Sequence, residues 1–274
     1  MWLLTCYNMR THFEAAKVSF NQSIQYRFGM LMSIFFSVFT VGVNYVIWSM
    51  VYSPGDMYGG YSFENIIVHA MLTGVMFSFM WDNWDETLSN YIYEGILFQI
   101  LLRPMSYIYF GLWWKLGNRA FAFLIEIIPT LCVYLILFPS HYMVPAHPLA
   151  FVVSLVIAFL LYFCMNFLLG CTAFWLKKNT GLRWANIVLR PLLIGTLLPL
   201  SFYPEVVQNV LVFLPFQYLF YVPSTAFIGN YGLGSLGFTL WESLLFGAGY
   251  VIVGFLVTVW VWTKGVEKFE GVGV

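Results

Sequence analysis

Six long, continuous apolar stretches constrain this chain more than any other feature of its sequence. Each is close to the length of about 20 residues with which an α-helix crosses the hydrocarbon core of a bilayer. Apolar and polar residues do not alternate strictly in them, as they would in the strands of a membrane β-barrel. The sequence therefore predicts an all-α polytopic membrane protein with six transmembrane helices, forming one transmembrane domain over residues 1–274. The predicted spans cover residues 28–52, 63–80, 120–138, 149–176, 184–200 and 240–263.

The composition agrees with this class and excludes others. Of the 274 residues, 61% are hydrophobic and only 9% are charged, whereas about a quarter are charged in a soluble domain. The 21% share of aromatic residues also excludes a disordered chain. Lysine and arginine balance aspartate and glutamate at 12 each. No net field attracts nucleic acid, so no nucleic-acid partner is expected.

The basic residues predict the orientation. All 12 lie before the first span, between the second and third, around the start of the fifth, or after the last. The connections over 53–62, 139–148 and 201–239 contain no lysine or arginine. Because connections rich in basic residues stay in the cytoplasm, both termini are expected on the cytoplasmic side. The basic residues are Arg10, Lys17, Arg27, Arg103, Lys115, Arg119, Lys177, Lys178, Arg183, Arg190, Lys264 and Lys268.

The segment 10–27, before the first span, has an amphipathic pattern. Mainly apolar residues recur along it at helical spacing, which predicts a helix lying on the inner membrane surface. A cytosolic extension of the first span is the alternative. The residues on this face are Phe13, Ala16, Lys17, Phe20 and Ile24.

Two further segments are too apolar for solvated loops and too irregular to span the membrane. The cytoplasmic segment 82–119 begins with acidic residues and continues with an apolar stretch, in which Pro104 should end a helix near Leu102. Such a segment should pack against the inner ends of the spans or against a partner protein.

Three prolines divide the outer segment 201–239 into short pieces. Irregular backbone at membrane depth must be buried in protein or line a cavity, so we expect a re-entrant pair of short helices there.

No motif for nucleotide binding or hydrolysis is present. The dipeptide Gly-Lys is absent, which excludes a P-loop, and there is no H-E-x-x-H or G-x-S-x-G sequence. His141 and His147 share a short outer connection, but two histidines without a carboxylate make a poor metal site. The four cysteines show no ligand spacing. No catalytic residue, cofactor or metal is therefore expected in this chain.

Ionisable residues inside the predicted spans are functional candidates, because a charge is costly within the bilayer. Glu126 lies in the third span, His69 in the second, and Arg190 enters the fifth. One interpretation places Glu126 or His69 on a path for solute or protons. The other treats Glu126 as a packing device, either neutral or hydrogen-bonded to a neighbouring helix.

Two stretches of sequence carry a family resemblance. EGILFQILLRPMS at 94–106 lies in the cytoplasmic segment, and PLSFYPEVVQNVLVFLPFQYLFYVPS at 199–224 lies mostly in the outer one. Together with the helix expected before the first span, they resemble the type-2 permease subunits of ATP-binding-cassette (ABC) transporters. The likeness covers essentially the whole chain. It is closest to the branch in which ATPase and permease are separate polypeptides, often with two different permeases.

The resemblance implies a role for each segment. The helix at 10–27 would be the elbow helix, the segment around 91–104 would form the coupling helix that docks on an ATPase, and fragments between 204 and 229 would close the extracellular gate. The coupling residues that match the family pattern are Tyr91, Glu94, Gly95, Leu101, Arg103 and Pro104. The residues expected near the path or gate are Glu126, His69, Phe213, Phe216, Tyr218, Phe220 and Tyr221.

The resemblance further implies an exporter of a lipid, glycan, peptide or natural product in the plasma membrane, of the bacterial or archaeal inner-membrane type. The chain itself would be no enzyme, because two copies of a partner ATPase would bind ATP and magnesium. A second permease, identical or homologous, would complete the path among membrane lipids. Two other functions stay open. An integral membrane enzyme acting on lipid would use Glu126, His69 and Asp82 as acid–base groups, and an ion-coupled secondary transporter would use Glu126.

Overall fold

The computed structural model describes residues 9–23, 27–103, 105–137, 144–176, 178–234 and 238–269. All regular elements in these ranges are helical, and no strand occurs in them. A single antiparallel bridge between Tyr58 and Tyr61 closes the turn that follows the first long helix. The all-α class predicted from the sequence is therefore confirmed.

Four helices in the described ranges are long and apolar enough to cross a membrane. Each coincides with a predicted span, because its apolar run is continuous and is not interrupted by proline. The remaining two predicted spans take different forms, so the count of six stays a prediction. The four helices are α2 (Arg27–Val51), α3 (Phe63–Met80), α8 (Pro148–Cys171) and α13 (Leu240–Lys268).

The third predicted span belongs to a longer helical stretch over residues 107–137. It consists of α6 (Tyr107–Ala122), the π-helical turn η2 (Phe123–Ile127) and α7 (Ile128–Leu137). Residues 107–119, which the sequence analysis assigned to the cytoplasmic segment, form the first turns of this stretch. Lys115 is buried there, so this basic residue does not mark a solvated connection.

The fifth predicted span corresponds to α10 (Thr180–Ile194), which has 15 residues. At 1.5 Å per residue it is about 22 Å long, shorter than a hydrocarbon core of about 30 Å. Pro191 lies in its last turn, and the helix ends at Gly195 in a left-handed conformation.

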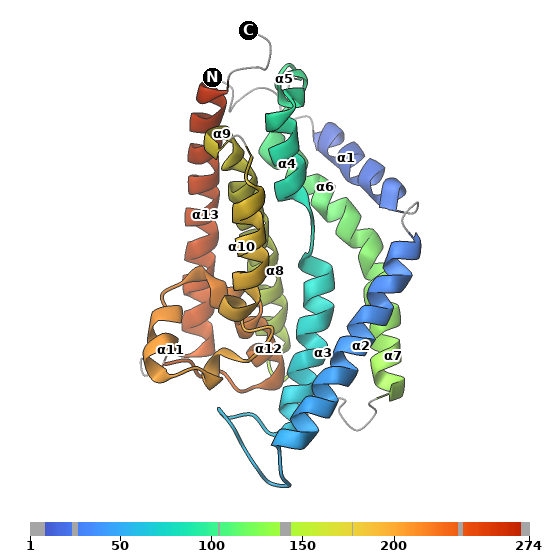
Figure 1. The fold of residues 1–274 in the computed structure, drawn as a ribbon, viewed down its shortest axis with the longest axis vertical. Coiled ribbons are helices and arrows are strands. Elements are labelled where there is room, and N and C mark those ends of the chain that lie inside the picture. Colours follow the sequence, from blue (N-terminus) through green and yellow to red (C-terminus); the bar gives the residue numbers. More distant parts are fainter. Residues whose placement is uncertain are drawn as a thin grey trace.

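The helices run roughly along the long axis of the molecule (Figure 1). The helices α8, α10 and α13 lie on one side of the view, and α2, α3 and α7 lie on the other. Segments predicted to be cytoplasmic gather toward the upper end, and the predicted outer segments gather toward the lower end. The upper group comprises α1 (Met9–Ser23), α4 (Trp84–Tyr93), α5 (Ile96–Leu101) and the last turns of α13. The short helix α9 (Ala173–Leu176), at the end of the fourth predicted span, also lies there. The lower group includes α11 (Glu205–Leu211) and α12 (Tyr221–Ile228).

The core is built along α8, whose residues belong to two hydrophobic clusters. Phe159 and Tyr162 pack with residues of the outer segment, such as Phe220. Phe163 and Phe167 pack in a second cluster, with aromatic residues of α4, α6 and α13 around them. By contrast, only 6% of the span in α2 and 17% of that in α13 is buried. Their apolar outer faces are therefore available to lipid or to another subunit.

The predicted amphipathic helix forms as α1 and packs across α6. At Gly117 of α6, a Cβ atom would lie 2.0 Å from the carbonyl oxygen of Ala16, so only glycine permits this crossing. Ser19 is buried and the ring of Phe20 meets Phe121 edge-on, whereas Phe13 is exposed. The face that packs on protein is thus rotated from the predicted apolar face. Ile24 lies outside the described residues.

The outer segment consists of short pieces, as its prolines predict. Two short helices, α11 and α12, are separated by a single 3-10 turn at Pro215–Tyr218. Whether this pair dips into the membrane stays a prediction.

Candidate functional site

The first candidate site stands on α4, which leaves the end of α3 and packs against α8. Leu88 and Ile92 of α4 are buried. At Gly170 of α8, a Cβ atom would lie 3.0 Å from the side chain of Leu88, which shows how closely the two helices approach. Asp85 and Glu86 occupy the first turn of α4, where negative charge favours a helix N-terminus. The helix α4 is therefore a firmly supported stalk.

Gly95 joins this stalk to α5. Its φ of +76° is left-handed, a conformation that glycine adopts without strain and other residues rarely do. Leu97 of α5 is buried, whereas the residues on the opposite side of this segment are exposed to solvent. We call residues 93–103 the coupling tip. The helix α5 ends at Leu101 with Leu102 as its C-cap, as Pro104 predicted.

The coupling residues implied by the resemblance divide into two groups. Glu94 and Arg103 are exposed, whereas Tyr91, Gly95 and Leu101 are half-buried. Pro104 lies outside the described residues.

The coupling tip exposes apolar residues that were not predicted from the sequence. Tyr93 is 54% exposed, Phe98 57% and Leu102 70%. Phe98 and Leu102 are four residues apart and so share a helix face. That spacing is the sequence signal that could have identified them.

The second candidate site is a network of buried charges at the non-helical break between α3 and α4. Asp82 in this break pairs with Lys115 of α6, with 2.5 Å between Oδ2 and Nζ. Asn166 of α8 donates to Asp82 Oδ1 at 3.0 Å. The Lys115 ammonium also lies 4.5 Å from the ring centroid of Tyr162. A buried ion pair needs such additional partners to offset the loss of hydration.

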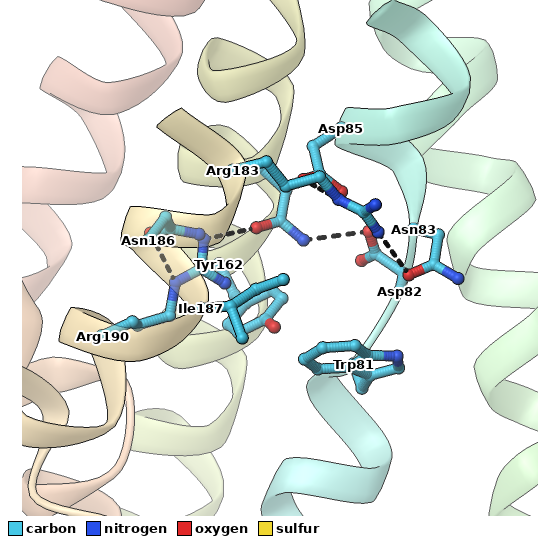
Figure 2. A pocket seen from close by; sticks show the side chains of 10 residues that line it. Trp81, Asp82, Asn83, Asp85, Tyr162, Arg183, Asn186, Ile187 and Arg190 are labelled. Carbon is cyan, nitrogen blue, oxygen red and sulfur yellow. Dashed lines mark hydrogen bonds and ion pairs between the residues drawn. The ribbon is translucent and has the colours of Figure 1, made fainter. Parts of the chain in front are cut away.

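The network extends to α10 through Arg183. Its Nε lies 3.0 Å from Asp85 Oδ2 and its Nη1 lies 2.8 Å from Glu86 Oε2. Its Nη2 also donates to Asn83 Oδ1 at 3.1 Å. Figure 2 shows Arg183 reaching from α10 toward Asp85 and Asn83. One guanidinium therefore ties the start of the stalk to α10.

A second arginine of α10 completes the network. Arg190 donates through Nε to Asn186 Oδ1 at 3.1 Å and through Nη2 to Asn166 Oδ1 at 2.7 Å. Because Asn166 also donates to Asp82, a chain of hydrogen bonds links Arg190 to the α3–α4 break. A cavity of about 20 Å³ lies between α10 and this break (Figure 2). That volume is close to the space of one water molecule.

His69 forms a separate junction in the other half of the molecule. Its Nε2 lies 2.9 Å from the Gly195 carbonyl, and its Nδ1 lies 3.0 Å from Ser224 Oγ. Since a carbonyl only accepts, Nε2 donates, and Nδ1 of a neutral ring is an acceptor for the Ser224 hydroxyl, whose one proton is shared between Nδ1 and the Tyr221 carbonyl at 2.9 Å. This junction joins α3, the end of α10 and α12 through uncharged groups.

The predicted gate residues do not share one surface. Tyr218, Phe220 and Tyr221 are buried, whereas Phe213 is 62% exposed and Phe216 is half-buried. The Tyr221 hydroxyl donates to the Gly232 carbonyl at 2.6 Å, within the outer segment itself. Most of these aromatic residues therefore hold the outer segment together in this conformation.

Glu126 is buried. It lies in the π-helical turn η2, which interrupts the α-helical geometry of a long helical stretch. Its carbonyl accepts from Thr130 Oγ1 at 2.7 Å. His69 is about 17 Å from Met80, the last residue of α3, along the helix axis at 1.5 Å per residue, and Asp82 lies beyond Met80 in the non-helical break. These two acid–base candidates for a lipid enzyme are not brought together. In the described part of the chain, no three His, Cys, Asp or Glu side chains cluster as metal ligands.

Comparison with known proteins assigns a family to this architecture. A family model described as ABC-2 family transporter protein matches residues 38–273, a range that includes the coupling tip, the polar network and the outer segment. No curated protein and no solved structure matches the chain. The match agrees with the resemblance found in the sequence. This chain is therefore an integral membrane protein of the ABC-2 transporter family, of the permease type.

Proposed function

We propose that this chain is the permease subunit of an ATP-driven exporter, forming half of a dimeric path and powered by a separate ATPase. The coupling tip carries the proposal. It presents the exposed apolar side chains of Tyr93, Phe98 and Leu102 on a stalk packed against α8. Exposed apolar clusters of this kind are typical of protein docking surfaces. Permeases of this family typically work with an ATPase subunit, which would bind the ATP and magnesium.

The orientation follows from the basic residues. The coupling tip lies at the same end of the molecule as α1 and the last turns of α13 (Figure 1). These segments carry basic residues, and the positive-inside rule places them in the cytoplasm of the cell that holds the protein in its plasma membrane. The tip would then face a cytosolic ATPase, with α1 as an elbow helix beside it.

Through the polar network, a movement of the coupling tip would be transmitted to the helix bundle. The stalk is attached to α8 by apolar packing and to α10 by Arg183. The α3–α4 break separates the stalk from the straight part of α3. Closure of two ATPases would move both tips, and α8 and α10 would follow, opening the path alternately to each side.

A second permease, identical or homologous, would supply the other half of the path. The largely unburied apolar face of α2 is available for such a contact. An amphipathic or hydrophobic cargo suits a path lined by apolar and aromatic side chains. We therefore propose that the cargo is a lipid, a peptide, a glycan or a natural product.

The test is purification of the tagged full chain from its own host in a mild detergent, followed by mass spectrometry and an ATPase assay. We expect a P-loop ATPase to copurify. The double variant Phe98→Ala with Leu102→Ala should recover at least tenfold less ATPase, as for the loss of a central apolar contact. Phe213→Ala, which removes an equally exposed ring at the opposite end, is the matched control and should recover as much as wild type.

Two results would contradict the proposal. One is a chain that purifies without any ATPase under conditions that preserve complexes. The other is equal ATPase recovery with the double variant and with wild type. Loss of transport in Glu126→Gln, in a chain without an ATPase, would instead support an ion-coupled transporter.

A further inference from the structure

Arg190 is a buried cation whose close partners are uncharged. It is 8% exposed, and its guanidinium hydrogen-bonds to the amides of Asn186 and Asn166. Its guanidinium carbon lies 4.7 Å from the ring centroid of Tyr162. Within the described ranges, the ion pairs found do not include Arg190. A buried charge is costly unless an opposite charge approaches it.

The other charges in the cavity wall already have partners. Four charged side chains line the cavity: those of Asp82, Asp85, Arg183 and Arg190. Asp82 is paired with Lys115, and Asp85 with Arg183. Each wall carboxylate therefore has its own cation, and the charge of Arg190 is left to attract an anion from outside.

Arg190 is held in place with donors to spare. Two of its nitrogens donate to the two asparagines, and the Tyr162 ring supports its plane. A guanidinium carries five N–H donors in a planar fork, which matches the oxygen atoms of a phosphate. The enclosed space is only about 20 Å³, but it is open to the outside. An oxyanion group at this opening can approach the Arg190 donors, whereas a whole lipid cannot enter.

The outer face of the same helix is apolar. Trp184, Val188 and Leu189 of α10 are all more than half exposed. Along the axis of α10, Arg190 lies about 15 Å from the first residue of the helix, at 1.5 Å per residue, so the cavity and the exposed apolar residues lie at similar heights along α10. An amphiphile that places its charged group at the cavity could extend its chains around the side of α10, past Ile187, onto this apolar face. A fully water-soluble anion would gain nothing from that apolar face.

We infer that this cavity binds the phosphate group of an anionic amphiphile, with Arg190 as the recognising residue and the apolar face of α10 as the support for its chains. Binding needs no ATPase. The inference therefore stands or falls separately from the proposed function.

The test uses the full-length chain in a neutral detergent, titrated with phosphatidic acid, with diacylglycerol, or with inorganic phosphate. Retained ligand is counted by native mass spectrometry, and the shift in Tm is measured in parallel. Phosphatidic acid should bind and raise Tm, whereas diacylglycerol, which lacks the phosphate, should not. Arg190→Gln should weaken phosphatidic acid binding by about tenfold or more, because a charge-assisted hydrogen bond is lost. Lys264→Gln, which removes an exposed positive charge of α13, should bind as wild type.

A second variant separates binding from folding. Asn186→Asp places a carboxylate beside Arg190 and gives it an internal partner. This variant should melt no lower than wild type, yet lose its preference for phosphatidic acid over diacylglycerol. Competition by excess inorganic phosphate would identify the free ion as a ligand, and its failure to compete would identify the lipid head group. The inference is overturned if wild type shows no preference for phosphatidic acid, or if Asn186→Asp and Arg190→Gln both bind it as wild type does.

Discussion

The two polar junctions along α3 are built from opposite chemistry. Near the coupling tip, Asp82 and Lys115 form a buried ion pair, and Asn166 and Arg183 extend it to α8 and α10. In the other half, His69 joins α10 and α12 through neutral hydrogen bonds. A buried ion pair loses much when one partner is removed, whereas neutral bonds lose less. The comparison indicates a charged junction on the side of the coupling tip, and a neutral junction that joins α3 to the outer segment.

The largest expected effect is at the charged junction. Lys115→Met should lower the free energy of unfolding by about 3–5 kcal/mol, because Asp82 is left buried without its cation. Thermal unfolding in detergent measures this loss. Lys264→Met is the matched control, since its exposed pair with Glu267 should contribute no more than about 1 kcal/mol. The double variant Lys115→Met with Asp82→Asn should recover most of the loss; no recovery would show that the lysine acts by packing alone.

A smaller effect is expected at the neutral junction. His69→Ala should cost about 2 kcal/mol, because the Gly195 carbonyl loses its donor and the Ser224 hydroxyl keeps only the Tyr221 carbonyl as a partner. The same thermal assay measures it. Ser224→Ala should cost about 1 kcal/mol, since only one of the two bonds is removed. A loss at His69 as large as that at Lys115 would break the comparison between the junctions.

The smallest effect on stability is expected at the connection from the stalk to α10. Arg183→Gln should cost about 1 kcal/mol, because the Arg183 side chain is 19% exposed, Glu86 is half exposed, and the glutamine amide can still donate to the buried Asp85 carboxylate. Its effect on coupling should be larger. In vesicles containing the complete transporter, ATP hydrolysis should continue while export per ATP falls. Glu86→Gln leaves the pair between Arg183 and Asp85 intact and should export normally; equal export by both variants would exclude this connection from the coupling route.

The parts of the fold that depend on local sequence were predictable. The helices α2, α3, α8 and α13 coincide with uninterrupted apolar runs, and α5 ends where Pro104 requires. These features follow from hydropathy and from proline stereochemistry, which act over one turn or one span.

The parts that depend on distant contacts were not predictable. Lys115 stands in a run of aromatic and basic residues that suggested a cytoplasmic connection, and only the distant Asp82, in the α3–α4 break, explains its burial. The polar network brings together residues of four helical segments far apart in the chain. The π-helical turn at Glu126 and the exposure of Phe98 depend likewise on packing, which the pattern of one segment does not contain.

The most direct test of the account compares the two ends of the molecule in the living cell. A photo-crosslinking amino acid is placed at Phe98 of the coupling tip or at Phe213 of the outer segment, positions of similar exposure at opposite ends. The account predicts that the probe at Phe98 captures a P-loop ATPase and that the probe at Phe213 does not. Capture of the ATPase at Phe213, or of no ATPase at Phe98, would contradict both the proposed orientation and the docking role of the tip.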